Sequence, residues 1–64
     1  MTFGKRLRAL RKSKGYRQGE LANRIGIKQS ILSLYELDKM QPTLERIEWF
    51  CVALNVTATE LLGF

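Results

Sequence analysis

Apolar residues recur along this chain at the three- and four-residue spacing of amphipathic helices, and no segment alternates in the manner of a strand. Breaks that contain glycine, proline or asparagine divide the pattern into short pieces. These pieces predict five helices, at about residues 2–13, 18–25, 28–37, 43–54 and 57–62. Because the connections are short, we expect one compact all-α domain that occupies residues 1–64.

Several residues suit the ends of these helices. Thr2 is a candidate N-cap for the first helix, and Thr57 with Glu60 has the spacing of a capping box before the last. Asn55 tolerates the left-handed conformation that ends many helices. The apolar positions of the fourth helix predict the set that faces the core: Leu44, Ile47, Phe50, Cys51 and Leu54.

The segment QGELANRIGIKQSILSLY, from Gln18 to Tyr35, has the form of two short helices on either side of Gly26. Ala22 is small enough to let the two helices approach closely, and glycine adopts the positive φ that a sharp turn needs. Apolar residues occupy the expected inner face: Leu21, Ile25, Ile27, Leu32 and Tyr35. This pattern predicts a helix-turn-helix over about residues 17–37, whose second helix enters the DNA major groove.

The net charge of +5 is unevenly distributed along the chain. Residues 1–28 contain nine cations and one anion, a net charge of +8, whereas residues 29–64 contain two cations and five anions, a net charge of −3. A basic half and an acidic half on one small domain indicate that a polyanion binds one face. Ordinary solvated surface cations are the alternative that charge alone leaves open.

The chain has no histidine, and its one cysteine, Cys51, has no partner for an internal disulfide. Most metal sites and most catalytic arrangements are therefore excluded, so we expect neither an enzyme nor a cofactor. No apolar run reaches membrane-spanning length, and no signal-peptide pattern opens the chain. The expected location is accordingly the cytoplasm of a bacterial cell or of a phage-infected host, with no membrane partner.

From Phe3 to Leu62 the chain resembles the phage-repressor-like helix-turn-helix family, the Cro/Xre group. The matching segments are FGKRLRALRKSKGYRQGELANRIGIKQSILSLYELDKMQP and TLERIEWFCVALNVTATELL, and the spacing is preserved across all five expected helices. The resemblance implies a five-helix lambda-repressor-like domain that binds double-stranded operator DNA, usually as a two-fold homodimer. It also implies a transcriptional regulator that acts as a repressor.

The resemblance carries several roles over by position. Residues that open the third helix reach base edges in this family, which implies the same for Lys28, Gln29 and Ser30. A glutamine amide can bond adenine N6 and N7 together, so Gln29 is the best candidate for direct readout. Gln18 matches a family glutamine that packs on a phosphate or braces a side chain of the recognition helix.

Four further residues match the family by position. Ser33 lies one turn after Gln29 and can donate to a phosphate, and Lys39 matches a family phosphate contact in the following loop. Arg11 and Glu36 match a pair that ties the first helix to the end of the third. We interpret that pair as structural.

The chain also departs from the family pattern. Arg17 replaces a common threonine N-cap, so the second helix is expected to begin less firmly, although Arg17 can act as a phosphate cation. Gly19 costs about 1 kcal/mol against alanine inside a helix. Asp38 replaces a common glycine and adds a negative charge beside a presumed phosphate. Ile31 and Leu34 stand where polar or basic residues are usual, and against DNA they can touch only thymine methyls.

Trp49 and Val52 lie at i and i+3 on the fourth helix, off its expected inner face. Exposed tryptophan is typical of interfaces, so we expect a homodimer contact or a protein partner there, with Phe64 as a possible third member. A tryptophan that merely covers one side of the core is the simpler alternative.

Two other functions stay open: an antitoxin-type protein that binds DNA and a protein target, and an interaction module that has lost DNA readout.

Overall fold

The structure is a computed structural model that describes all 64 residues, and its helices lie close to the predicted positions. It contains no strand, which confirms the all-α class. The predicted ranges differ mainly because they include cap residues that lie outside the helices. The five helices are α1 (Phe3–Ser13), α2 (Gln18–Ile25), α3 (Gln29–Glu36), α4 (Leu44–Leu54) and α5 (Ala58–Leu62).

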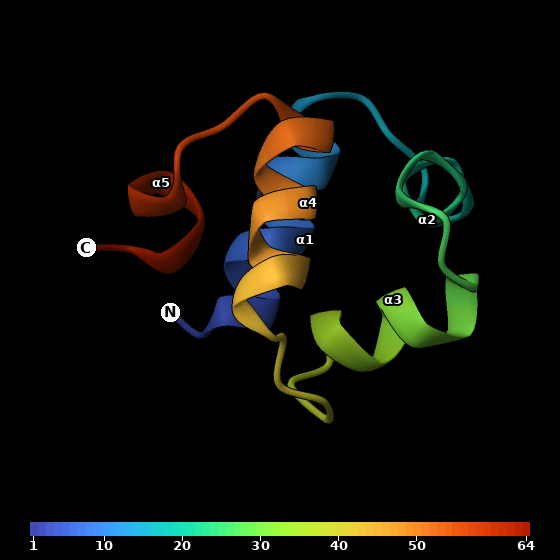
Figure 1. The fold of residues 1–64 in the computed structure, drawn as a ribbon, viewed down its shortest axis with the longest axis horizontal. Coiled ribbons are helices and arrows are strands. Elements are labelled where there is room, and N and C mark those ends of the chain that lie inside the picture. Colours follow the sequence, from blue (N-terminus) through green and yellow to red (C-terminus); the bar gives the residue numbers. More distant parts are fainter.

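The helices surround one small core. Figure 1 shows α4 in front of α1 at the centre of the view, with α2 and α3 on one side and α5 on the other. α1 packs against α3 and α5, α4 packs against α2 and α5, and α2 packs against α3. No helix is long and apolar enough to span a bilayer.

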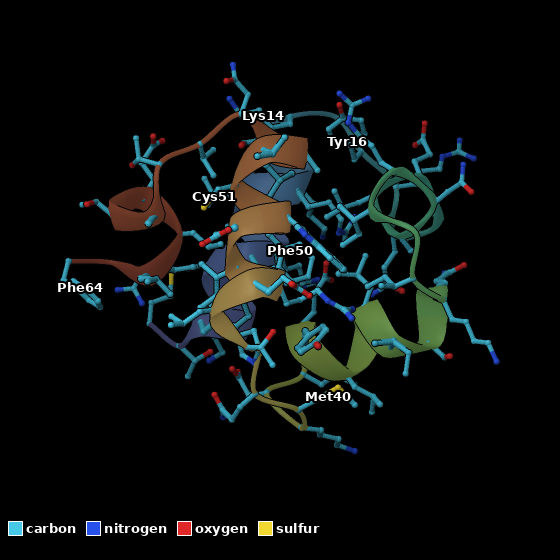
Figure 2. The ribbon with its side chains drawn as sticks, in the orientation of Figure 1. Lys14, Tyr16, Met40, Phe50, Cys51 and Phe64 are labelled. Atoms are coloured by element: carbon cyan, nitrogen blue, oxygen red, sulfur yellow. The ribbon has the colours of Figure 1, made fainter.

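Phe50 of α4 occupies the centre of this core (Figure 2). Its ring meets Tyr35 edge-on, with centroids 5.7 Å apart, and lies 6.3 Å from the ring of Phe3. The buried apolar residues come from all five helices: Leu7, Leu21, Ala22, Leu32, Tyr35, Phe50, Ala53, Leu54 and Leu61.

The prediction that Leu44 faces the core is wrong, because its side chain is 80% exposed. Leu44 is the first residue of α4, directly after the N-cap Thr43, and the inward stripe of this helix begins only at Ile47. A helical spacing extended by one turn places a residue on the correct face of the helix. It does not show that the neighbouring elements extend far enough to cover it.

Helix ends follow the predicted chemistry. The side chains of Thr2 and Thr57 accept from backbone N–H groups in the first turns of α1 and α5, and Glu60 completes the capping box of α5. Asn55 ends α4 with φ 55°, in the left-handed region. Arg17 makes no side-chain cap, as expected, but its backbone N–H donates to Glu20 Oε1 at 2.8 Å. Glu20 therefore supplies half of a capping box, and α2 still begins at the predicted residue.

Gly4 allows α1 to lie directly on the end of α3. A Cβ at this position would lie 2.5 Å from the carbonyl oxygens of both Tyr35 and Glu36. No side chain fits in that space, so only glycine permits this approach. The contact holds the N-terminal turn of α1 beside the loop that follows α3.

Candidate nucleic-acid interface

The turn between α2 and α3 has the expected geometry. Gly26 has φ 77°, and the N–H of Ile27 bonds back to the carbonyl of Ala22 at 3.0 Å. Ala22 is buried, which permits the close packing of α2 against α3. Lys28 precedes α3 in an extended conformation. The first residues of α3 are exposed at the surface.

A buried ion pair joins α1 to the end of α3. Arg11 Nε and Nη2 donate to the two carboxylate oxygens of Glu36 at 2.7 and 3.0 Å. Arg11 Nη1 donates to the carbonyl of Tyr16 at 2.9 Å. The pair is bidentate and almost fully enclosed, with 8% and 3% of the two side chains exposed. The structure thus contains the pair expected from the resemblance.

Two glutamines extend this pair to the start of α3. Gln18 Nε2 donates to Glu36 Oε1 at 3.2 Å, and Gln29 Nε2 donates to Gln18 Oε1 at 3.3 Å. Of the two roles considered for Gln18, the structure contains the bracing contact to the third helix. Gly19 gives the amide of Gln29 room, since a Cβ there would lie 3.2 Å from Gln29 Oε1.

This arrangement orients the amide of Gln29 at the surface. Its Oε1 atom has no protein donor, and one hydrogen of Nε2 also has no protein partner. An acceptor and a donor therefore remain free, side by side, on an exposed residue in the first turn of α3. These are the two groups that a bidentate contact to an adenine edge requires.

The other candidate residues of α3 divide into two groups. Lys28 and Ser30 are exposed, and Ser33 and Leu34 are half-buried. Ile31 packs against the core, so its apolar character has a structural cause. Arg17 and Lys39, which flank the helix-turn-helix, have exposed side chains without a protein hydrogen-bond partner.

The structure adds two cations that the sequence did not single out. Lys5 and Arg8 of α1 line a hollow of about 460 Å³ together with Gln18, Ser33 and Glu36. Both belong to the nine cations of residues 1–28. The three-residue spacing of positions 5 and 8 placed both on one face of that helix, but only the close contact at Gly4 shows that this face adjoins α3.

Asp38 is bonded to the start of α1. Its backbone is left-handed, with φ 59°, and its carboxylate turns toward the N-terminus of α1. It accepts from the Thr2 hydroxyl at 2.5 Å and from the Gly4 N–H at 2.8 Å. The negative charge expected at this position is therefore present, and hydrogen bonds to the start of α1 hold it in place. The Thr2 hydroxyl above all, and then the Gly4 amide, lower the pKa of this carboxyl.

Trp49 and Val52 line a shallow groove of about 480 Å³ between α2 and α4, together with Arg24, Ile25 and Ala53. Phe64 does not join them. It lies beyond α5, on the side of α4 away from α2 (Figure 2). The candidate interface therefore contains the α4 pair and residues of α2 in place of the C-terminal residue.

Cys51 is half-buried on the side of α4 that faces α5 (Figure 2), and burial, followed by the charges of Glu48 and Glu60, raises the pKa of its thiol. The protein has no group of three or more histidine, cysteine, aspartate or glutamate residues arranged to hold a metal ion.

Comparison with known proteins agrees with this geometry. The helix-turn-helix family model matches residues 7–61. The HTH-type transcriptional regulator YazB of Bacillus subtilis is 41% identical over 59 residues, which cover 92% of this chain and 86% of YazB. The immunity repressor of Bacillus phage phi105 is 32% identical over 63 residues, which cover 98% of this chain but only 44% of that repressor.

A solved structure shows the same fold. The P22 c2 repressor protein, in complex with a synthetic operator, superimposes with a TM-score of 0.88 at 29% identity, over 97% of this chain and 94% of that chain. These relatives are transcription regulators rather than enzymes. On its sequence and its fold, the chain belongs to the phage-repressor-like helix-turn-helix family of transcriptional regulators.

Proposed function

We propose that this chain is a sequence-specific DNA-binding repressor that reads operator DNA in the major groove through α3. The observation that carries the proposal is the polar chain from Arg11 and Glu36 through Gln18 to Gln29. It holds one amide in a defined orientation at the exposed start of the second helix of a helix-turn-helix. A side chain held in this way loses less conformational entropy on binding a base than a free glutamine does.

The residues around Gln29 divide into base contacts and phosphate contacts. Gln29 bonds adenine N6 and N7, and the exposed side of Leu34 packs on a thymine methyl. The cations Lys28 and Lys39 bind the flanking phosphates. Because the Gln18 side chain is engaged with Glu36 and Gln29, its contribution to phosphate binding comes from the free N–H groups at the start of α2.

Further phosphate contacts come from side chains around the same surface. Arg17 stands directly before α2, and Ser33 lies beside the cations Lys5 and Arg8 in one hollow. Cations so close to the recognition helix raise the affinity for any DNA sequence. They also fix the orientation of the domain on the duplex.

We further propose that two copies bind one operator. A two-fold dimer places two α3 helices in successive major grooves, about 34 Å apart, on a pseudo-palindromic site. Occupancy of such a site excludes polymerase and represses transcription. The phage phi105 relative is named as an immunity repressor, and the P22 relative was crystallised with an operator, which supports this assignment.

One observation favours a second function in addition to DNA binding. The apolar groove at Trp49 and Val52 offers a site for another protein, as in an antitoxin that binds its toxin. A protein-interaction module without DNA readout is less favoured, because two residues that suggested it have structural roles. Ile31 packs against the core, and the carboxylate of Asp38 is bonded to the start of α1.

Selection from a randomised DNA pool tests the proposal. Duplexes retained by the wild type are sequenced and compared with those retained by Gln29→Ala. The matched control is Asn23→Ala, which removes an exposed amide from α2 away from the start of α3. We expect a pseudo-palindrome for the wild type and the control, with information lost at one base pair per half-site for Gln29→Ala. Retention without any sequence preference would contradict the proposal.

A further inference from the structure

Glu36 is the buried start of the hydrogen-bonded chain that ends at Gln29. Its side chain is 3% exposed, and its two carboxylate oxygens both accept from Arg11. Its Oε1 atom also accepts from Gln18 Nε2 at 3.2 Å. A side chain that is almost closed to solvent is therefore joined, through one intervening residue, to the exposed amide in the first turn of α3.

The chemistry of Glu36 fixes the direction of every hydrogen bond in this chain. An ionised carboxylate only accepts hydrogen bonds, whereas an amide has a donating side and an accepting side. Gln18 must therefore turn its NH2 group to Glu36, which leaves its oxygen for Gln29. Gln29 in turn presents its own NH2 group to that oxygen, at 3.3 Å. Turning either amide over would place oxygen against oxygen.

The bond to Gln18 is the only hydrogen bond that the side chain of Gln29 makes within the protein. Gly19 lies beside Gln29 Oε1 and has no side chain that could donate to it. The last torsion of a glutamine is broad and two-fold, so an unrestrained amide turns over easily. Glu36, acting through Gln18, thus decides which way round the amide of Gln29 lies.

The orientation of this amide distinguishes the two purines. Adenine and guanine share the N7 acceptor, but adenine presents the N6 donor where guanine presents the O6 acceptor. In the proposed contact with adenine, the amide oxygen of Gln29 faces N6 and its nitrogen faces N7. Guanine would place O6 against that oxygen. An amide free to turn over donates to O6 instead and tolerates guanine.

We propose that Glu36 is a positioning residue that makes the recognition helix select adenine over guanine. The carboxylate holds the amide of Gln29 in the orientation that suits adenine, and the same orientation repels guanine. This inference rests on the proposed function, in which Gln29 contacts an adenine. It gives Glu36 a role in base selection in addition to its ion pair with Arg11.

Two operators that differ at one base pair test this role. In the second operator, hypoxanthine opposite 5-methylcytosine replaces the adenine–thymine pair that selection assigns to Gln29. Hypoxanthine presents N7 and O6 as guanine does, but it adds no amino group to the minor groove, and 5-methylcytosine keeps the methyl group of thymine. Fluorescence anisotropy measures both affinities. We expect the wild type to prefer the adenine operator about tenfold.

Two variants remove the restraint at different points. Glu36→Gln replaces the group that only accepts, and Gln18→Met removes the intervening amide but leaves the ion pair intact. We expect each variant to reduce the preference for adenine to about twofold or less. The double variant should reduce it no further, because Glu36 acts through Gln18.

A matched control separates positioning from packing. Asp38→Asn weakens another contact that holds the start of α1, and it leaves the chain from Glu36 to Gln29 intact. We expect this variant to keep the full preference for adenine. Circular dichroism shows which variants are folded, and Gln18→Met tests the role even where Glu36→Gln is too unstable to measure.

The restraint itself is measured in the free protein. Nitrogen-15 relaxation of the side-chain amides reports the mobility of Gln29 Nε2. We expect an ordered amide in the wild type and a mobile one in Gln18→Met. Gln41, an exposed glutamine without a hydrogen-bond partner, should be mobile in both proteins.

A full preference for adenine in Gln18→Met would overturn the inference. So would an equal loss of preference in Asp38→Asn, or a Gln29 amide that is as mobile in the wild type as in Gln18→Met. Because relaxation is measured without DNA, an ordered amide in a protein that selects no operator would count against the proposed function. A mobile amide in a protein that does select an operator would count against this inference alone.

Discussion

Asp38 accepts hydrogen bonds from the Thr2 hydroxyl and the Gly4 amide, and these bonds lower the pKa of its carboxyl below the ordinary 3.8. A carboxylate whose pKa is lower in the folded state binds protons more readily when the chain is unfolded. Its contribution to the stability of the fold is therefore complete above pH 3.8 and is lost as the pH falls through the folded pKa. The stability that Asp38 gives to the N-terminal turn of α1 therefore depends on pH.

We expect Asp38→Asn to lower the midpoint of thermal unfolding at pH 7, because the neutral amide accepts these hydrogen bonds more weakly. The difference from the wild type should shrink at a second, acidic pH below 3.8, where protonation of the wild-type carboxylate weakens the same hydrogen bonds. Circular dichroism at both pH values measures it. Glu45→Gln, an exposed carboxylate without a hydrogen-bond partner, serves as the control. A difference that stays constant with pH would contradict the assigned role.

At the scale of the element, α1 depends on its contact with the end of α3. Gly4 brings the two backbones together at Tyr35 and Glu36, and Arg11, two turns further along α1, pairs with the same Glu36. α3 is therefore anchored to α1 at its C-terminal end, while its N-terminal end, with Gln29, remains at the surface. This arrangement keeps the recognition residues exposed on a helix that is firmly attached.

We expect Gly4→Ala to destabilise the fold by about 1–3 kcal/mol, because the added methyl group meets two backbone carbonyls that cannot move independently of α3. The gain in helix propensity, about 1 kcal/mol, is included in this range. Urea unfolding measures the change. Lys5→Ala, the adjacent exposed position, should alter stability by less than about 0.5 kcal/mol. Equal stability of Gly4→Ala and the wild type would contradict the close approach.

Much of this element structure follows from local signals that the sequence carries. Thr2, Asn55 and Thr57 mark helix ends because caps depend on neighbours within one turn. The position of Asp38 was not predictable in the same way, since its partners lie 34 and 36 residues earlier in the chain. Leu44 was misplaced for a related reason. Periodicity gives the face of a helix but not the extent of the elements that cover it.

The same limit applies to the candidate site. The residue types and spacing indicated Gln18 and Gln29, and the resemblance indicated the pair of Arg11 with Glu36. Neither the sequence pattern nor the resemblance showed that Glu36 and the two glutamines form one continuous chain of hydrogen bonds. The contribution of Lys5 and Arg8 emerged only from the packing of α1 against α3.

At the scale of the whole molecule, the charge asymmetry predicts how binding responds to salt. The basic first half of the chain supplies the cations near α3, and each phosphate neutralised on duplex DNA contributes a slope of about −0.9 to the logarithm of affinity against the logarithm of salt concentration. We expect Lys5→Ala and Arg8→Ala each to reduce the magnitude of this slope by about 0.9, the contribution of one phosphate contact. The preferred DNA sequence should not change.

Fluorescence anisotropy with the selected operator at several salt concentrations measures these slopes. Lys14→Ala removes a cation from the opposite end of α1 (Figure 2) and should leave the slope close to that of the wild type. Slopes that are unchanged in Lys5→Ala and Arg8→Ala would show that the hollow beside Ser33 does not face the DNA backbone.

The measurement that tests the central claim most directly couples Gln29 to a single atom of the operator. The adenine identified by selection is replaced with 7-deazaadenine, which lacks N7, and the affinities of the wild type and Gln29→Ala are measured on both duplexes. If Gln29 reads this base, the wild type loses about 1–3 kcal/mol of binding free energy on the modified duplex, and Gln29→Ala loses almost nothing. Equal losses for the two proteins would show that α3 does not read the operator through Gln29.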